Sequence, residues 1–113
     1  MQQWIEICAI EDIPKLGARV IKTWQGDIAI FRDAHDQVFA LQDRCPHRGG
    51  PLSQGIVHGQ RVTCPLHNWA IELASGIAVA PDEGCAERYQ LRLEDGVISL
   101  FLEAGPALEA IPA

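Results

Sequence analysis

The chain has 113 residues, the size of one ordinary domain, and its 48% hydrophobic and 21% charged residues are typical of a folded soluble protein. Its net charge of −6 argues against nucleic acid or an anionic membrane as a partner. The start shows no basic patch followed by an apolar run, and no apolar stretch approaches the ~20 residues of a membrane span. We therefore expect a cytoplasmic protein.

Short strands separated by turns follow one another along the chain. Residues 19–24, before a Gln-Gly-Asp sequence, begin a hairpin with residues 27–32. The stretches 27–32 and 37–42 carry branched or aromatic apolar side chains on both faces, as strands sandwiched between two layers do. The intervening Asp-Ala-His-Asp, residues 33–36, indicates a hairpin turn.

The clearest strand pattern lies near the end, at residues 88–102. Asp95-Gly96 can supply the positive φ angles of a tight turn, with residues 97–102 returning. One face before the turn would be apolar and the other wet: Tyr89, Leu91 and Leu93 against Arg88, Gln90, Arg92 and Glu94. With no long helical stripe anywhere, the chain is predicted to be all-β, built from antiparallel sheets. The Ala/Pro-rich tail, 104–113, is expected to be loose.

Two Cys-His pairs interrupt the strands, Cys45-x-His47 and Cys64-x-x-His67, joined by a hairpin that should turn at His58-Gly59. Two thiolates and two imidazoles can bind one zinc ion, or they can hold a 2Fe–2S cluster. A proline follows each cysteine and glycines follow the first histidine, which favours a stiff cradle with exposed backbone N–H groups, and hence iron. The remaining cysteines, Cys8 and Cys85, are expected to be single small buried residues rather than a redox pair.

The stretches CPHRGGPL and CPLHNW resemble the Rieske iron–sulfur signature. The resemblance implies that Cys45 and Cys64 bind the inner iron of one 2Fe–2S cluster, and that His47 and His67 bind the outer iron. It also implies a Rieske fold of antiparallel sheets: a single domain over 1–103, with a small cluster-binding subdomain inserted at about 43–82. Pro81 resembles the proline of the family's third loop, which covers the cluster. Zinc and a disulfide pair remain as the less favoured alternatives.

The resemblance also bears on the reduction potential. Two thiolates leave the oxidised cluster neutral, which raises the potential of such centres to about −150 to +300 mV. In respiratory members an extra disulfide joins the loops, and hydroxyl groups bond to cluster sulfurs. The matching residues here, Gly50 and Leu66 for the disulfide and Trp69 and Ile71 for the hydroxyls, cannot do the same. We therefore predict a potential below about +100 mV.

Over nearly all of residues 4–102 the chain resembles the small subunit of the assimilatory NAD(P)H nitrite reductase, which reduces nitrite to ammonium. The resemblance implies a large partner subunit with FAD, a 4Fe–4S cluster and sirohaem, and no catalytic residue on this chain. The expected function is electron transfer within that complex, in nitrate assimilation. The alternative is a free Rieske ferredoxin that feeds a ring-hydroxylating dioxygenase, and a third possibility is a zinc-stabilised adaptor.

Overall fold

The computed structural model describes residues 2–23, 26–45, 50–64, 69–79, 84–103 and 111–112. Short strands account for nearly all of the regular structure within these ranges. In chain order the elements are β1 (Gln2–Ala9), η1 (Ile10–Asp12), β2 (Gly17–Thr23), β3 (Gly26–Arg32), β4 (Val38–Gln42), η2 (Leu52–Gln54), β5 (Ile56–His58), β6 (Arg61–Thr63), β7 (Ala70–Glu72), β8 (Arg88–Tyr89), β9 (Leu91–Glu94), β10 (Val97–Glu103) and β11 (Ile111–Pro112).

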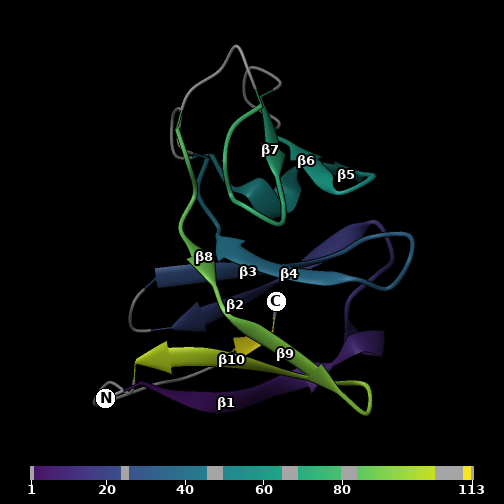
Figure 1. Ribbon diagram of the computed structural model, residues 1–113, viewed down its shortest axis with the longest axis vertical. Coiled ribbons are helices and arrows are strands. Elements are labelled where there is room, and N and C mark those ends of the chain that lie inside the picture. Colours follow the sequence, from purple (N-terminus) through teal and green to yellow (C-terminus); the bar gives the residue numbers. More distant parts are fainter. Residues whose placement is uncertain are drawn as a thin grey trace.

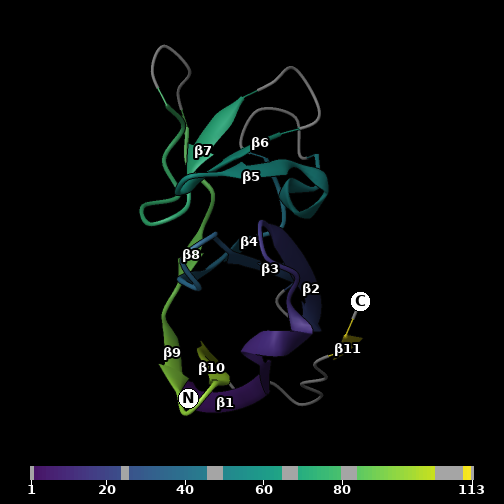
Figure 2. The same cartoon turned by 90° about the vertical axis from the view of Figure 1, so that its right-hand side faces the viewer.

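Three antiparallel sheets are stacked one above the other (Figures 1 and 2). The lower sheet has the order β1-β10-β9, the middle sheet β11-β2-β3-β4-β8, and the upper sheet β5-β6-β7. In the described ranges the only helical segments are the two three-residue 3-10 turns, η1 and η2. The prediction of an all-β chain of antiparallel sheets is therefore confirmed.

The middle sheet separates two hydrophobic cores because its central strands are apolar on both faces. Ile28 and Ile30 of β3 enter the core shared with the lower sheet, while Ala29 and Phe31 enter the core shared with the upper sheet. The alternation in β4 is the same, with Ala40 facing the lower core and Leu41 the upper one. This arrangement confirms the sandwiched strands that the sequence predicts.

The hairpin turns agree closely with the sequence. The β2–β3 hairpin pairs Thr23 with Gly26, and the turn between β3 and β4 closes with a bond from the Asp33 N–H to the Gln37 carbonyl, N···O 2.9 Å. Asp95 and Gly96 take φ angles of 51° and 78°, the positive values expected of the turn before β10. The β5–β6 turn lies one residue later than predicted, at Gly59-Gln60, since His58 still belongs to β5.

The stretch after residue 88 departs from the single strand expected there. The chain pairs with β4 as β8, leaves the middle sheet at Gln90, and joins the lower sheet as β9. Leu93, predicted to be on the apolar face, is 40% exposed. It lies on β9, the edge strand of the sheet β1-β10-β9, and no other described strand pairs with the outer edge of β9.

Both chain ends add strands that the sequence pattern did not indicate. β1 pairs with β10 along its whole length, with a register irregularity between Glu6 and Cys8. Ile111–Pro112 form β11 against β2, so these two tail residues differ from the loose tail expected, and 104–110 lie outside the described residues. Among the described helices none is long and apolar enough to cross a bilayer.

Candidate metal centre

The two cysteines of the predicted signature follow strands of different sheets. Cys45 lies three residues after β4 of the middle sheet, and Cys64 directly follows β6 of the upper sheet. Both are almost fully buried, with exposed fractions of 1% and 0%, and both belong to the core between these two sheets. Each cysteine thus lies on the stretch of chain that follows a strand.

The backbone after each cysteine is closed in the same way. The Cys45 N–H donates to the carbonyl of Gly50, and the Cys64 N–H donates to the carbonyl of Trp69, each with an N···O distance of 2.7 Å. Residues 45–50 and 64–69 are called here the first and second Cys–His segments. Each cysteine is thus held both by its buried side chain and by a hydrogen bond to the far end of its segment.

The histidines of the signature, His47 and His67, and Pro81 lie outside the described residues. The part of the chain that the structure describes contains no group of three or more His, Cys, Asp or Glu side chains that could hold a metal ion. That result covers only the cysteine half of the predicted site. The ligand set Cys45, His47, Cys64 and His67 therefore stays a prediction.

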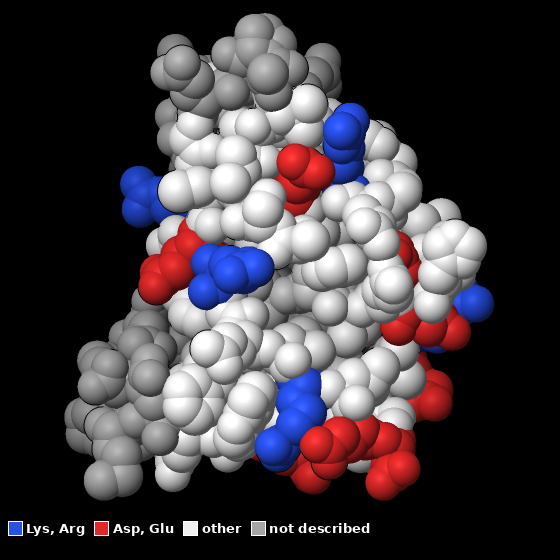
Figure 3. Space-filling view, in the orientation of Figure 1, with Lys and Arg blue, Asp and Glu red and all other residues white. Residues whose placement is uncertain are grey.

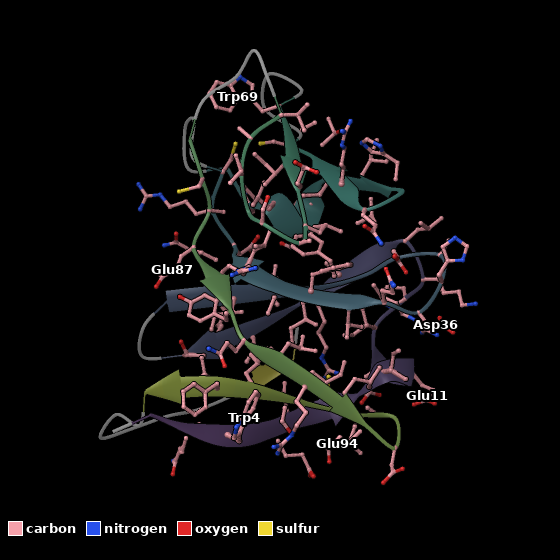
Figure 4. The ribbon with its side chains drawn as sticks, in the orientation of Figure 1. Trp4, Glu11, Asp36, Trp69, Glu87 and Glu94 are labelled. Atoms are coloured by element: carbon pink, nitrogen blue, oxygen red, sulfur yellow. The ribbon has the colours of Figure 1, made fainter. Side chains whose placement is uncertain are left out.

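The surroundings of the second segment are apolar. Ile71 of β7 is completely buried in the same core as the two cysteines, and Trp69 is half-buried against that core. Figure 4 shows Trp69 at the upper end of the molecule, at the opposite end from Trp4. Ile71 thus lies within, and Trp69 against, the core that holds the two cysteine thiols. These are the two positions that carry hydroxyl groups in respiratory members.

Cys8 and Cys85 are neither fully buried nor paired with each other. None of the four cysteines forms a disulfide. Cys85 is exposed, against the prediction of a buried residue, and forms an isolated bridge with Ile77 beside the upper sheet. Cys8 is half-buried on β1, and this burial raises the pKa of its thiol, with Asp12 adding to the rise and Arg19 opposing it. His35 and His58, expected at solvated turns, are both exposed.

Two polar residues next to the first segment were not singled out from the sequence. The carboxylate of Asp43 accepts one hydrogen bond from the Ser53 N–H and another from the Ser53 hydroxyl. The sequence did hold one indication of this contact. Asp43 and Ser53 have short side chains that can form hydrogen bonds, and they lie on the two sides of residues 45–50.

The described residues fit the thiolate half of a 2Fe–2S site. Cysteine thiolates are the usual protein ligands of such clusters, and a histidine-ligated iron needs only two of them. Two reduced thiols emerge into one apolar core from two segments closed in the same way. An apolar environment of this kind, which excludes most solvent, suits a redox centre.

Comparison with known proteins gives a consistent result. A family model described as "Rieske [2Fe-2S] domain" matches residues 3–90. The chain is 48% identical over 52 residues to the 4beta-methylsterol monooxygenase of Methylococcus capsulatus, 46% of this chain but 14% of that protein, so it spans a small part of that relative.

Two relatives match along almost their whole length. The nitrite reductase (NADH) small subunit of Escherichia coli K12 is 34% identical over 109 residues, 88% of this chain and 98% of that protein. The ferredoxin component of the naphthalene 1,2-dioxygenase/salicylate 5-hydroxylase systems of Ralstonia is 25% identical over 103 residues, 90% of this chain and 98% of that protein. The NMR structure of the E. coli protein NirD superimposes with a TM-score of 0.77 at 31% identity, covering 92% of this chain and 100% of that one.

Proposed function

The chain belongs to the Rieske [2Fe-2S] domain family, and on that premise we propose that it is the electron-transfer subunit of a NAD(P)H-dependent nitrite reductase, which converts nitrite to ammonium. Its family indicates one Rieske-type 2Fe–2S cluster as cofactor and electron transfer as its general role. The observation that carries the finer proposal is the end-to-end likeness to a nitrite reductase small subunit.

In this proposal Cys45 and Cys64 bind one iron and His47 and His67 bind the other. The cluster, when bound, takes up and releases one electron at a time. The chain's own residues bury the two thiols, close the two Cys–His segments with backbone hydrogen bonds, and place the buried, apolar Ile71 where respiratory members carry a hydroxyl group. Fewer donors to the cluster sulfurs favour a potential in the lower part of the Rieske range, which suits electrons that come from NAD(P)H.

The proposed partner is a large subunit that carries FAD, a 4Fe–4S cluster and sirohaem, and we place its docking site at the Trp69 end of the molecule. Glu11, Asp36 and Glu94 lie away from this end (Figure 4), and acidic side chains gather toward the lower part of the face in Figure 3. Among the described residues, these three carboxylates therefore do not crowd the proposed docking end.

The proposal is tested with the assembled complex. His67→Ala should still assemble with the large subunit, shown by co-purification, but should lose most NAD(P)H-dependent nitrite turnover because the outer iron loses a ligand. The His35→Ala variant is the matched control, since His35 is an exposed histidine on the β3–β4 turn. Unchanged turnover in an assembled His67→Ala complex would refute electron transfer through this cluster.

The second candidate is a free ferredoxin that delivers electrons to a ring-hydroxylating dioxygenase. The observation that favours it is the match along 98% of a dioxygenase ferredoxin component, at a lower identity. The two candidates are separated by using the chain as bait in its own cell extract. Recovery of a sirohaem flavoprotein supports the nitrite reductase, whereas recovery of an oxygenase or its reductase supports the ferredoxin.

A further inference from the structure

The same kind of backbone hydrogen bond joins the two ends of each Cys–His segment, but the residues that flank the two segments are held together differently. Next to the second segment, Thr63 of β6 pairs with Ala70 of β7, so a strand ladder continues directly from the Cys64–Trp69 bond. Next to the first segment no ladder is present between the flanking described residues, because β4 ends at Gln42 and the chain after Gly50 forms η2. The first segment therefore needs another device to hold its two flanks together.

Asp43 and Ser53 supply that device. The Ser53 N–H donates to Asp43 Oδ1 at 2.7 Å, and the Ser53 hydroxyl donates to Asp43 Oδ2 at 2.8 Å. These bonds enclose the Cys45–Gly50 bond, as the next rung of a ladder would. Both residues are half-buried, so water competes less for these bonds than it would at the surface.

The Asp43–Ser53 pair, called here the clamp, is joined to the rest of the fold on both sides. The Asp43 N–H donates to the carbonyl of Asp27 at the start of β3, with an N···O distance of 2.9 Å. On the other side, Ser53 follows Leu52, which is completely buried in the core that contains Cys45 and Cys64. The bonds from Ser53 to Asp43 thus connect the middle sheet to the residue that follows the buried Leu52.

We propose that Asp43 is a positioning residue for the cluster: its carboxylate, by holding Ser53, replaces the missing strand ladder and fixes Cys45 relative to Cys64. A carboxylate fits this role because both of its oxygens accept, and bonds to a charged acceptor are roughly twice as strong as neutral ones. This inference rests on the cluster and not on the identity of the partner. It is therefore tested on the chain alone, and its failure would leave the nitrite reductase proposal standing.

Asp33 provides a matched control. Its Oδ1 also accepts two hydrogen bonds, from the N–H groups of His35 and Gln37 at 2.8 and 2.9 Å. It lies in the turn at the other end of β4 from Cys45. Loss of the Asp33 carboxylate should thus weaken the fold without loosening the first segment.

The experiment compares the cluster-loaded variants Asp43→Ala, Asp43→Asn, Ser53→Ala and Asp33→Ala at denaturant concentrations that give equal global stability. Two quantities are measured: the rate at which an iron chelator bleaches the visible absorption, and the width of the EPR lines after reduction. Asp43→Ala should bleach about tenfold faster than Asp33→Ala, because loss of a charge-assisted hydrogen bond makes local opening of the first segment more frequent. The EPR lines of Asp43→Ala should also broaden. Asp43→Asn can still accept from the Ser53 N–H and donate to the Ser53 hydroxyl but loses the charge, so its bleaching rate should lie between those of wild type and Asp43→Ala.

Ser53→Ala keeps the backbone bond to Asp43 and loses the hydroxyl bond, so its bleaching rate should lie between those of wild type and Asp43→Ala. This variant also tests the proposal if Asp43→Ala does not fold. Equal bleaching of Ser53→Ala and wild type, or equal rates and line widths in Asp43→Ala and Asp33→Ala, would overturn the positioning role.

Discussion

Gly55 is a glycine whose replacement should disturb the cluster region, although its backbone is ordinary. It ends η2 with a φ of −80°, which any residue can adopt. A Cβ at this position would lie 2.3 Å from the carbonyl oxygen of Thr63 and 2.9 Å from Cγ2 of Val62. An ordinary carbon–oxygen contact is about 3.4 Å, so η2 and β6 would have to separate by about 1 Å next to Cys64.

Gly59, four residues along, presents the opposite case. Its φ is +57°, which disfavours a side chain, but a Cβ there would meet nothing within 4 Å. Gly59→Ala should cost about 1 kcal/mol, the penalty of a left-handed backbone for a residue with a Cβ. Gly55→Ala should cost about 3 kcal/mol, the upper part of the range for overpacking, because the atom in the way belongs to a paired backbone that cannot rotate aside.

The assay is urea unfolding of the cluster-loaded protein, followed by far-ultraviolet circular dichroism and by the visible absorption. We expect Gly55→Ala to lower the unfolding midpoint clearly more than Gly59→Ala and to lose its visible absorption at a lower urea concentration than its circular dichroism signal. A Gly59→Ala variant that is destabilised as much as Gly55→Ala would refute the reasoning, since backbone conformation would then outweigh the close approach of η2 and β6.

Two further predictions concern the thiols and one ion pair. Iodoacetamide near pH 8 should label Cys85 about tenfold faster than Cys8, because Cys85 is exposed whereas burial raises the pKa of Cys8; equal rates by peptide mass spectrometry would contradict this. Two hydrogen bonds from Arg32, at 3.0 and 2.8 Å, hold the pKa of Asp36 below its usual value. The stabilisation of the fold by these bonds is present above the pKa of Asp36 in the unfolded state. It is lost as the pH falls through the lower pKa of Asp36 in the folded state. Asp36→Asn should therefore lower Tm at pH 7, and the gap to wild type should close on acidification; a gap independent of pH would count against the ion pair.

The central strands could be predicted because one physical pattern determines them. Ile28, Ala29, Ile30 and Phe31 are apolar without interruption, and such a strand is stable only when both of its faces are covered. The structure covers one face with the lower sheet and the other with the upper sheet. The Asp95-Gly96 turn was predictable for a local reason, since few residue pairs accept two positive φ angles.

The exchange of sheets at Gln90 could not be predicted from local pattern. Residues 88–94 alternate as one continuous strand would, and only tertiary packing assigns β8 to the middle sheet and β9 to the lower one. β1 was missed for a similar reason. It pairs with β10, at separations from Ala9–Val97 to Gln2–Glu103, so its partner and register could not be read from the local pattern.

Of the candidate site, the sequence predicted which residues carry the chemistry but not what holds them. The Cys–His spacing identified Cys45 and Cys64, and the structure buries both in one core. The Asp43–Ser53 clamp joins residues ten positions apart on the two sides of the first Cys–His segment, so only the folded chain shows that they meet. The exposure of Cys85 likewise could not be predicted from the residue type, since cysteine is usually buried.

The measurement that tests the central claim most directly is pulsed EPR of the purified chain after reduction with dithionite. Ligation by Cys45, His47, Cys64 and His67 predicts a rhombic signal of low average g, with couplings to two histidine nitrogens. In His67→Ala one of the two couplings should be absent from any cluster that remains. A colourless protein with one bound zinc ion, or a 2Fe–2S signal without nitrogen coupling, would contradict the Rieske ligand set and the electron-transfer role built on it.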